Sequence, residues 1–177
     1  MFIKNDATKK ADFYVKNVDK EFLILSKIAG IKIILAEEIE KNLVDTNGID
    51  VYRYKYDPSK EFKGPLVTAN IKNYKTVFDY IRKHPNRVFA VIADFNNFIT
   101  DNESHLDFIK SLRKIYSIPL LYGSGATNVH ELISPVILNY AIEFFYGIKN
   151  FDDKKLYRSF FEKLTGLLGD ERYFEKI

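Results

Sequence analysis

A glycine-rich tripeptide, Gly123-Ser124-Gly125, follows a predicted strand and leads toward a predicted helix start at Ser134-Pro135. Backbone N–H groups in such a turn can bind a phosphate oxygen. In parallel α/β folds the functional groups lie at this end of the sheet, where the strands finish. We therefore take Gly123, Ser124 and Gly125 as a candidate phosphate-binding loop. Tight loop geometry is the alternative reason for two glycines here.

Two carboxylates, Asp12 and Asp94, lie at or near the ends of predicted strands, where a catalytic base could stand. Neither has a neighbouring His or Lys to complete a reactive pair, so helix capping or turn formation is the alternative role. The three histidines, His84, His105 and His130, lack the i, i+2 or i, i+4 spacing of metal ligands. We predict no catalytic residue and no metal site on this chain.

Positive charge is concentrated between Tyr52 and Arg87. This segment has nine Lys and Arg against three Asp and Glu, a net charge of +6, whereas the whole chain has +3. Tyrosines are interleaved with these cations, and phosphates attract Lys and Arg while aromatic rings can stack on bases. An ordinary solvated surface is the alternative. The residues that we predict to contact RNA are Lys72, Lys75, Arg82, Lys83 and Arg87, with Arg113 and Lys114 extending the cluster.

The elements that must position these residues alternate between strand and helix. Apolar runs bounded by turn residues predict strands at 12–15, 31–36, 51–56, 66–71, 87–95 and 118–122. Helical spacing of apolar residues, with a Thr100–Glu103 capping box and a Ser134-Pro135 start, predicts helices at 19–29, 74–81, 100–116, 135–147 and 152–168. Strands joined by crossover helices form parallel sheets with helices outside, so we predict one α/β domain over 1–177.

The composition sets further bounds. At 177 residues and 46% apolar the chain can bury a core, and 15% aromatic residues exclude intrinsic disorder. The absence of cysteine excludes disulfides, Cys-ligated zinc, iron–sulfur clusters and thiol catalysis. The longest apolar run, Val88–Ala93, is far shorter than the roughly 20 residues that span a bilayer. With no apolar signal core near the first residue, we expect a cytoplasmic protein.

The stretch Leu106–Gly147 resembles the C-terminal part of the ribonuclease P protein component 3 family, the archaeal relatives of the thirty-kilodalton eukaryotic subunit. The family pattern is a helix, a strand, a Ser-Ser/Gly-Ala turn, an acidic–apolar pair and an x-Pro helix start. The matching residues are Leu106–Tyr116, Ile118–Tyr122, Ser124-Gly125-Ala126, Glu131-Leu132 and Ser134-Pro135. The opening strand Asp12–Val15 with its following helix also fits.

The resemblance implies a TIM-barrel-like fold of the PHP type, with a parallel sheet, outer helices and no metal ligands. It implies a protein subunit that supports RNA-catalysed removal of the 5′ leader from precursor tRNA. The Mg²⁺ would belong to the RNA component, so no cofactor is expected on the protein. The implied partners are ribonuclease P RNA, precursor tRNA and the component 2 (Pop-five type) subunit, and the isolated subunit is not expected to be catalytic.

The chain departs from the family pattern in two ways. Relatives usually have arginines flanking the x-Pro step, where this chain has Ile133 and Val136, so those RNA contacts do not carry over. Between Asp94 and His105 the chain also lacks about one βα unit of a fuller barrel. We therefore expect an incomplete barrel.

Three alternative functions remain. A small barrel enzyme could bind a phosphorylated metabolite at Gly123-Ser124-Gly125 with Asp12 or Asp94 as base. A metal-dependent nuclease would need three or four carboxylates at strand ends, and the candidates are Asp12, Asp94 and Asp101. An interaction scaffold would leave the basic segment unused. For contact with a partner subunit we expect an apolar excess on the last helix, at Phe160, Phe161 and Leu164.

Overall fold

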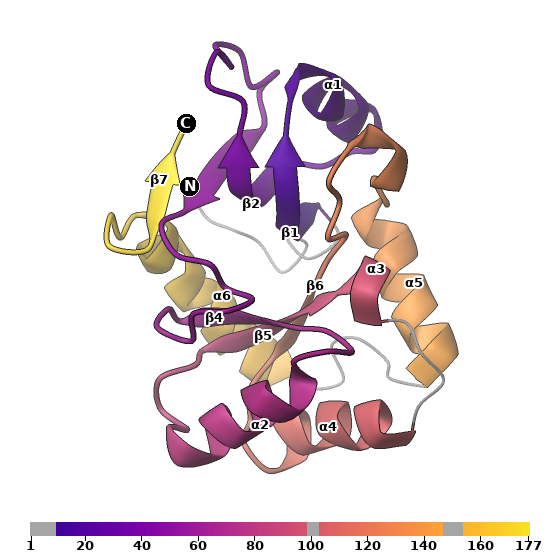
Figure 1. The fold of residues 1–177 in the computed structure, drawn as a ribbon, viewed down its shortest axis with the longest axis vertical. Helices are drawn as coiled ribbons and strands as arrows, with labels where there is room; N and C mark the ends of the chain where they lie inside the picture. The colour runs from indigo at the N-terminus through magenta and orange to yellow at the C-terminus, as the bar shows by residue number, and fades with distance from the viewer. Residues whose placement is uncertain (1–9, 99–102, 147–153) are drawn as a thin grey trace.

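The computed structural model describes residues 10–98, 103–146 and 154–177. Helices and strands alternate through most of this range, as the apolar pattern predicts (Figure 1). The strands are β1 (Ala11–Val18), β2 (Ile33–Ile39), β3 (Asp50–Tyr54), β4 (Leu66–Ala69), β5 (Ala90–Asp94), β6 (Leu120–Gly123) and β7 (Phe174–Lys176). The helices are α1 (Lys20–Ile28), α2 (Tyr74–Lys83), α3 (Phe95–Phe98), α4 (Glu103–Lys114), α5 (Pro135–Tyr146) and α6 (Lys154–Leu168), with a 3₁₀ turn at Val129–Glu131.

The strands form two sheets. One has the order β1-β2-β3-β7, in which β1, β2 and β3 are parallel and β7 runs antiparallel to β3. The other has the order β4-β5-β6 and is entirely parallel. The protein is thus a mixed α/β fold with parallel sheets and flanking helices, as predicted.

A short seam joins the two sheets where the chain leaves β6. The Gly125 N–H donates to the Tyr14 carbonyl over 2.8 Å, and the Lys16 N–H donates to the Ala126 carbonyl over 2.8 Å. The six parallel strands therefore follow one another in space as β4-β5-β6-β1-β2-β3. On the far side β3 pairs with β7 rather than β4, and no closed barrel forms in the described part of the chain. The contacts on this side include the Tyr56 hydroxyl, which donates to the Leu66 carbonyl over 2.8 Å, and the Thr68 N–H of β4, which donates to the Pro58 carbonyl over 2.8 Å.

Helices cover the outer faces of both sheets. The outward side chains of β4, β5 and β6 pack with α2 and α4 in a cluster that includes Val77, Ile81, Ile109 and Leu112, all fully buried. On the other sheet, α1 buries Phe22 and Leu23 against the outward side chains of β1 and β2. In the described residues, no helix has the length and apolar character needed to cross a membrane.

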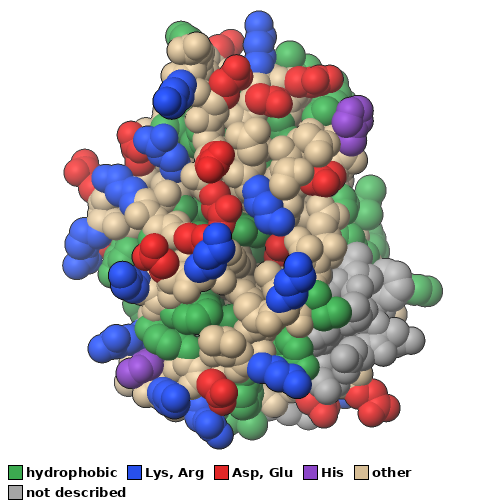
Figure 2. Space-filling model, viewed as in Figure 1, with side chains coloured by type: hydrophobic (Ala, Val, Ile, Leu, Met, Phe, Trp, Pro, Cys, Tyr) green, Lys and Arg blue, Asp and Glu red, His purple; other side chains and the backbone are tan. Residues whose placement is uncertain are grey.

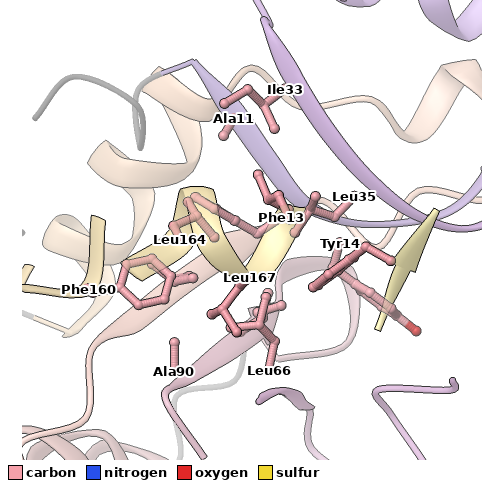
Figure 3. Packing of buried hydrophobic residues seen from close by; sticks show 14 of the residues in the cluster. Ala11, Phe13, Tyr14, Ile33, Leu35, Leu66, Ala90, Phe160, Leu164 and Leu167 are labelled. Atoms are coloured by element: carbon pink, nitrogen blue, oxygen red, sulfur yellow. The ribbon is translucent and has the colours of Figure 1, made fainter. Parts of the chain in front are cut away.

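The inner faces of both sheets are covered by α6. Figure 3 shows Phe160, Leu164 and Leu167 lying among apolar side chains of both sheets, from Phe13 and Leu35 to Leu66 and Ala90. Because the sheets do not close on themselves, their inner side chains need a cover, and this helix provides it.

This packing shows that one sequence-based expectation is wrong. Phe160 and Phe161 are each only 4% exposed and Leu164 is fully buried, so α6 has no apolar excess at these positions for a partner. The core takes both phenylalanines because α6 packs between the inner faces of the two sheets. Exposed apolar side chains lie instead on α5, at Val136, Ile137, Tyr140 and Phe144.

We predict that Leu164→Ala lowers the free energy of unfolding by about 3 kcal/mol, because it leaves a cavity between the two sheets. Urea denaturation followed by circular dichroism measures the change. Leu25→Ala is the matched control, since Leu25 lies on α1 and is 38% exposed. Its cost should stay below about 1 kcal/mol. Equal losses in the two variants would contradict the role assigned to α6.

Candidate nucleic-acid interface and polar strand-end cluster

The predicted RNA contacts lie on α2 and the two turns that flank it. All five side chains predicted there are exposed, namely Lys72, Lys75, Arg82, Lys83 and Arg87. Among the described residues, Arg82 is the member of this set with a carboxylate within salt-bridge distance, Asp79 at 3.1 Å. Figure 2 shows Lys and Arg side chains around the end of the molecule where α2 lies. We call these five residues the α2 basic patch.

The two other predicted RNA contacts, Arg113 and Lys114, belong to the last turn of α4. Their side chains lie outside the described part of the structure. α4 packs beside α2 on the same sheet, so its end belongs to the same side of the molecule as the α2 basic patch (Figure 1). Asp101, a candidate ligand in the nuclease alternative, lies in the undescribed range 99–102 together with the predicted cap Thr100.

Gly123, Ser124 and Gly125 form the seam between the sheets. The Ser124 N–H donates to Asp12 over 2.9 Å and the Gly125 N–H donates to the Tyr14 carbonyl, so both groups have acceptors within the protein. A Cβ at Gly123 would overlap the backbone of Tyr14. A Cβ at Gly125, where φ is +67°, would overlap the Asp94 carboxylate. Close approach of β6 to β1 thus requires Gly123, and the positive φ and the contact with Asp94 of β5 require Gly125. The phosphate-binding loop stays a prediction.

Asp12 is fully buried within this seam. Its Oδ1 accepts hydrogen bonds from the backbone N–H groups of Tyr14 and Ser124, at 3.2 and 2.9 Å. Its Oδ2 accepts one from the Ser124 hydroxyl at 2.6 Å, and that hydroxyl oxygen in turn accepts from the Ala126 N–H. Burial raises the pKa of Asp12 to about 7, although the bonds from Ser124 and Tyr14 act to lower it. Asp12 therefore serves to join two strands.

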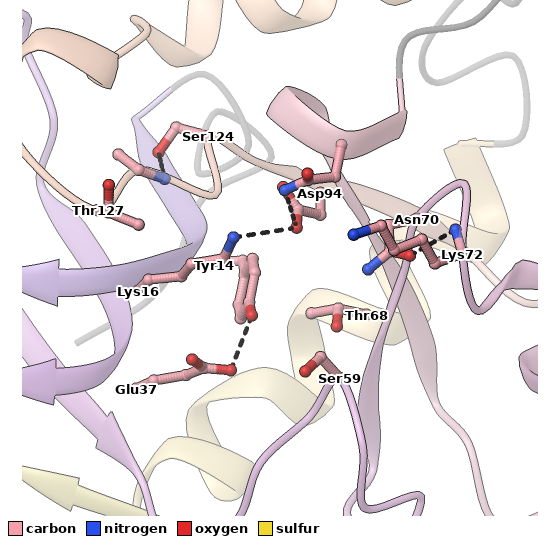
Figure 4. Close-up of polar contacts among 12 residues, drawn as sticks. Tyr14, Lys16, Glu37, Ser59, Thr68, Asn70, Lys72, Asp94, Ser124 and Thr127 are labelled. Atoms are coloured by element: carbon pink, nitrogen blue, oxygen red, sulfur yellow. Dashed lines mark hydrogen bonds and ion pairs between the residues drawn. The ribbon is translucent and has the colours of Figure 1, made fainter.

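Asp94, the second predicted carboxylate, ends β5 and is 1% exposed. Its Oδ2 accepts from the Asn97 amide at 3.0 Å and lies 3.9 Å from the Lys16 ammonium (Figure 4). Its Oδ1 has no hydrogen-bond partner within the described residues, and the same is true of the buried Thr68 hydroxyl. Burial raises the pKa of Asp94 above its ordinary value, while Asn97 and Lys16 act to lower it.

A second carboxylate approaches the same region from β2. The Tyr14 hydroxyl donates to Glu37 over 2.7 Å. Burial raises the pKa of Glu37; the bond from Tyr14 opposes this shift, nearby Asp57 adds to it and Lys16 again opposes it. Lys16 thus opposes the upward pKa shift of both Asp94 and Glu37. Figure 4 shows these side chains converging from neighbouring strands, and we call Tyr14, Lys16, Glu37, Thr68 and Asp94 the strand-end cluster.

The strand-end cluster combines one ammonium, two carboxylates with raised pKa and two hydroxyls. Such a set can hold polar groups and exchange protons, and structural ion-pair networks perturb pKa values in the same way. Within the described ranges, no group of three or more His, Cys, Asp or Glu could hold a metal ion.

Sequence reasoning missed Tyr14, Lys16, Glu37 and Thr68 as members of this cluster. The available signal was a polar residue at the last inward position of successive strands. In β1, Tyr14 and Lys16 are two residues apart, the spacing that places strand side chains on one face. An inward-pointing lysine at the end of a buried strand needs a carboxylate partner, and Glu37 occupies the corresponding end of β2.

Comparisons with known proteins identify no relative. No family model matches the chain, and neither a curated protein nor a solved structure matches it.

Proposed function

We propose that this protein is a subunit of ribonuclease P, which binds RNA and supports RNA-catalysed removal of the 5′ leader from precursor tRNA. The observation that carries the proposal is the α2 basic patch. Its five exposed cations lie on one helix and its flanking turns, with one acidic residue, Asp79, in between. Four of the five, all but Arg82, have no carboxylate within salt-bridge distance among the described residues. Exposed Lys and Arg bind phosphates and release counterions, which is the main source of affinity for RNA.

The strand order supports the resemblance on which this proposal also rests. Parallel strands that follow one another as β4-β5-β6-β1-β2-β3, with helices outside, are what a TIM-barrel-like fold of the PHP type would show if it were opened between β3 and β4. We infer that the chain is an incomplete barrel of this type, whose open side is covered by α6 and β7.

The proposal assigns phosphodiester hydrolysis to the RNA and its Mg²⁺. On this proposal the protein screens phosphates and holds RNA helices in register, together with the component 2 protein. The strand-end cluster is then a structural ion-pair network, in which Lys16 lies near Asp94 and the Tyr14 hydroxyl donates to Glu37.

A salt titration tests the proposal. Binding to ribonuclease P RNA and to precursor tRNA is measured from low to high KCl, with and without the component 2 protein. Affinity should fall steeply with salt and rise when the partner is added. The triple variant Arg82→Gln, Lys83→Gln, Arg87→Gln should reduce the magnitude of the negative slope of log K against log[salt] by about 2, because three phosphate contacts are lost.

The matched control is the triple variant Lys20→Gln, Lys27→Gln, Lys32→Gln, which removes three exposed cations from the part of the chain around α1. It should leave the slope nearly unchanged. If the wild-type protein binds neither RNA with or without the partner, the proposed function is wrong. Equal effects of the two triple variants would instead show that the contact is not localised to the α2 basic patch.

A further inference from the structure

A groove lies between α2 and α4, next to the α2 basic patch. Its volume is about 430 Å³, within the range of roughly 300–1,000 Å³ that small-molecule sites occupy. The lining residues are Tyr74, Lys75, Phe78, Asp79, Asp107, Phe108 and Ser111. On α2 they form two pairs with a spacing of four residues, Tyr74 with Phe78 and Lys75 with Asp79. This spacing places each pair on one side of the helix.

Three aromatic rings form the apolar wall of the groove. Phe108 is 4% exposed, and the rings of Tyr74 and Phe78 meet it edge-on, with centroids 5.8 and 6.1 Å away. Tyr74 and Phe78 are only partly buried, so part of each ring faces the groove. A buried ring that holds two others in place makes a rigid platform, and stacking on such a platform loses little entropy.

The rim of the groove is polar and has both signs of charge. Lys75 holds its ammonium 5.9 Å from the centre of the Tyr74 ring, next to the apolar wall. Asp79 is compensated by Arg82 at 3.1 Å. Asp107 is exposed, and the described residues place no cation within salt-bridge distance of it. The rim thus offers a cation suited to a phosphate and a carboxylate suited to a hydrogen-bond donor.

We propose that this groove binds one unpaired nucleobase of an RNA strand, and that it prefers guanine to uracil. The inference rests on the proposed function, because the α2 basic patch must bring RNA to the groove. The base stacks on the rings of Tyr74 and Phe78, as unstacked bases do in single-stranded recognition. Lys75 neutralises the adjoining phosphate.

The preference for guanine follows from the Asp107 carboxylate. A carboxylate only accepts hydrogen bonds, and its two oxygens match two adjacent donors. The Watson–Crick edge of guanine presents two, N1–H and the N2 amino group. Uracil presents one N–H between two carbonyl oxygens, which a carboxylate repels. Exchange of Asp107 for an amide should therefore reduce the preference without removing the stacking.

The first test uses guanosine 5′-monophosphate and uridine 5′-monophosphate as probes of the isolated protein. Chemical-shift changes in NMR spectra should be confined to α2 and α4 and should be larger for the guanosine probe. The second test measures binding to ribonuclease P RNA. Phe78→Ala should weaken binding about 5- to 150-fold, the range for loss of one stacked base. Asp107→Asn should reduce the discrimination between the two mononucleotide probes.

The matched control is Phe89→Ala. Phe89 is also a partly exposed ring, at 41%, with a lysine ammonium 5.8 Å from its centre, but it lies outside this groove. It should leave RNA affinity within twofold of wild type. Phe78 also packs on the core, so Phe78→Ala can destabilise the fold. Phe78→Leu is therefore tested as well, because leucine removes the ring but keeps an apolar contact with the core.

The outcomes separate the two proposals. If the RNA binds with the expected salt dependence but Phe78→Leu and Asp107→Asn leave affinity and base preference unchanged, this inference is wrong and the proposed function stands. If no RNA binds, the proposed function itself is wrong. If NMR chemical shifts of α2 and α4 change when a partner protein is added but not when either nucleotide is added, the groove is a protein-docking site and the inference is wrong.

Discussion

Replacing Gly123 with alanine should lower the free energy of unfolding by about 4 kcal/mol or more, a large share of the roughly 5–15 kcal/mol by which native domains are stable. The added methyl group would overlap the backbone nitrogen and the Cβ of Tyr14 on β1. The Tyr14 backbone cannot relieve this overlap by a change of rotamer, as a long side chain could. β6 must therefore move away from β1, and the seam between the sheets must open. Urea denaturation monitored by circular dichroism measures the loss.

Two other glycines provide controls for this result. Gly166 lies within α6 and a Cβ there meets nothing within 4 Å, so Gly166→Ala should stabilise the protein by up to about 1 kcal/mol. Gly30 has φ of +78° with open space around it, so Gly30→Ala should cost only the backbone strain, about 1–2 kcal/mol. If Gly123→Ala is no worse than Gly30→Ala, β6 and β1 do not lie as close as described.

The second large effect concerns Asp12. Its folded pKa of about 7 stands above the ordinary value of 3.8, so between these values the folded protein holds a proton that the unfolded chain has released. The contribution of protonated Asp12 to the free energy of unfolding is fully present below about pH 4 and is lost as the pH rises through 7. The free energy of unfolding should fall by about 4 kcal/mol between pH 4 and pH 8 from this group alone.

Asp12→Asn isolates this contribution. Asparagine keeps an oxygen that can accept from the Tyr14 and Ser124 N–H groups but cannot ionise. Asp94 and Glu37 also have raised pKa values, so the variant should keep a weaker decline with rising pH. Denaturation at pH 5.0 and 8.0 should show a difference between wild type and variant that depends on pH. A constant difference would mean that Asp12 does not change its protonation in this range.

The sequence pattern predicted the alternation of elements well because it reflects local burial. The run Val88–Ala93 is apolar at every position, as in a strand covered on both faces. Its last four residues together with Asp94 form β5 and are all buried, whereas Phe89 lies before the strand and is 41% exposed. The predicted helices at 19–29 and 74–81 became α1 and α2 with shifts of one or two residues at their ends. Missed elements were short, namely α3 and β7, whose three or four residues are too few for a periodic signal.

The sequence placed Gly123, Ser124, Gly125, Asp12 and Asp94 near strand ends, and the structure brings all five to one seam. Their roles could not be deduced from local pattern. Whether the Ser124 N–H faces a ligand or another strand depends on what lies across from it, and the structure places Asp12 there, over 100 positions earlier in the chain.

By itself, then, the sequence determined the α/β class, the order of strands and helices, and the concentration of positive charge around α2, because periodicity and charge are properties of neighbouring residues. Only the tertiary structure decided the rest. It paired β3 with β7 rather than with β4, buried Phe160 and Phe161, and joined Tyr14, Lys16, Glu37 and Asp94 in one cluster. These features depend on contacts between residues far apart in the chain, whose free energy is settled by how whole sheets and helices pack.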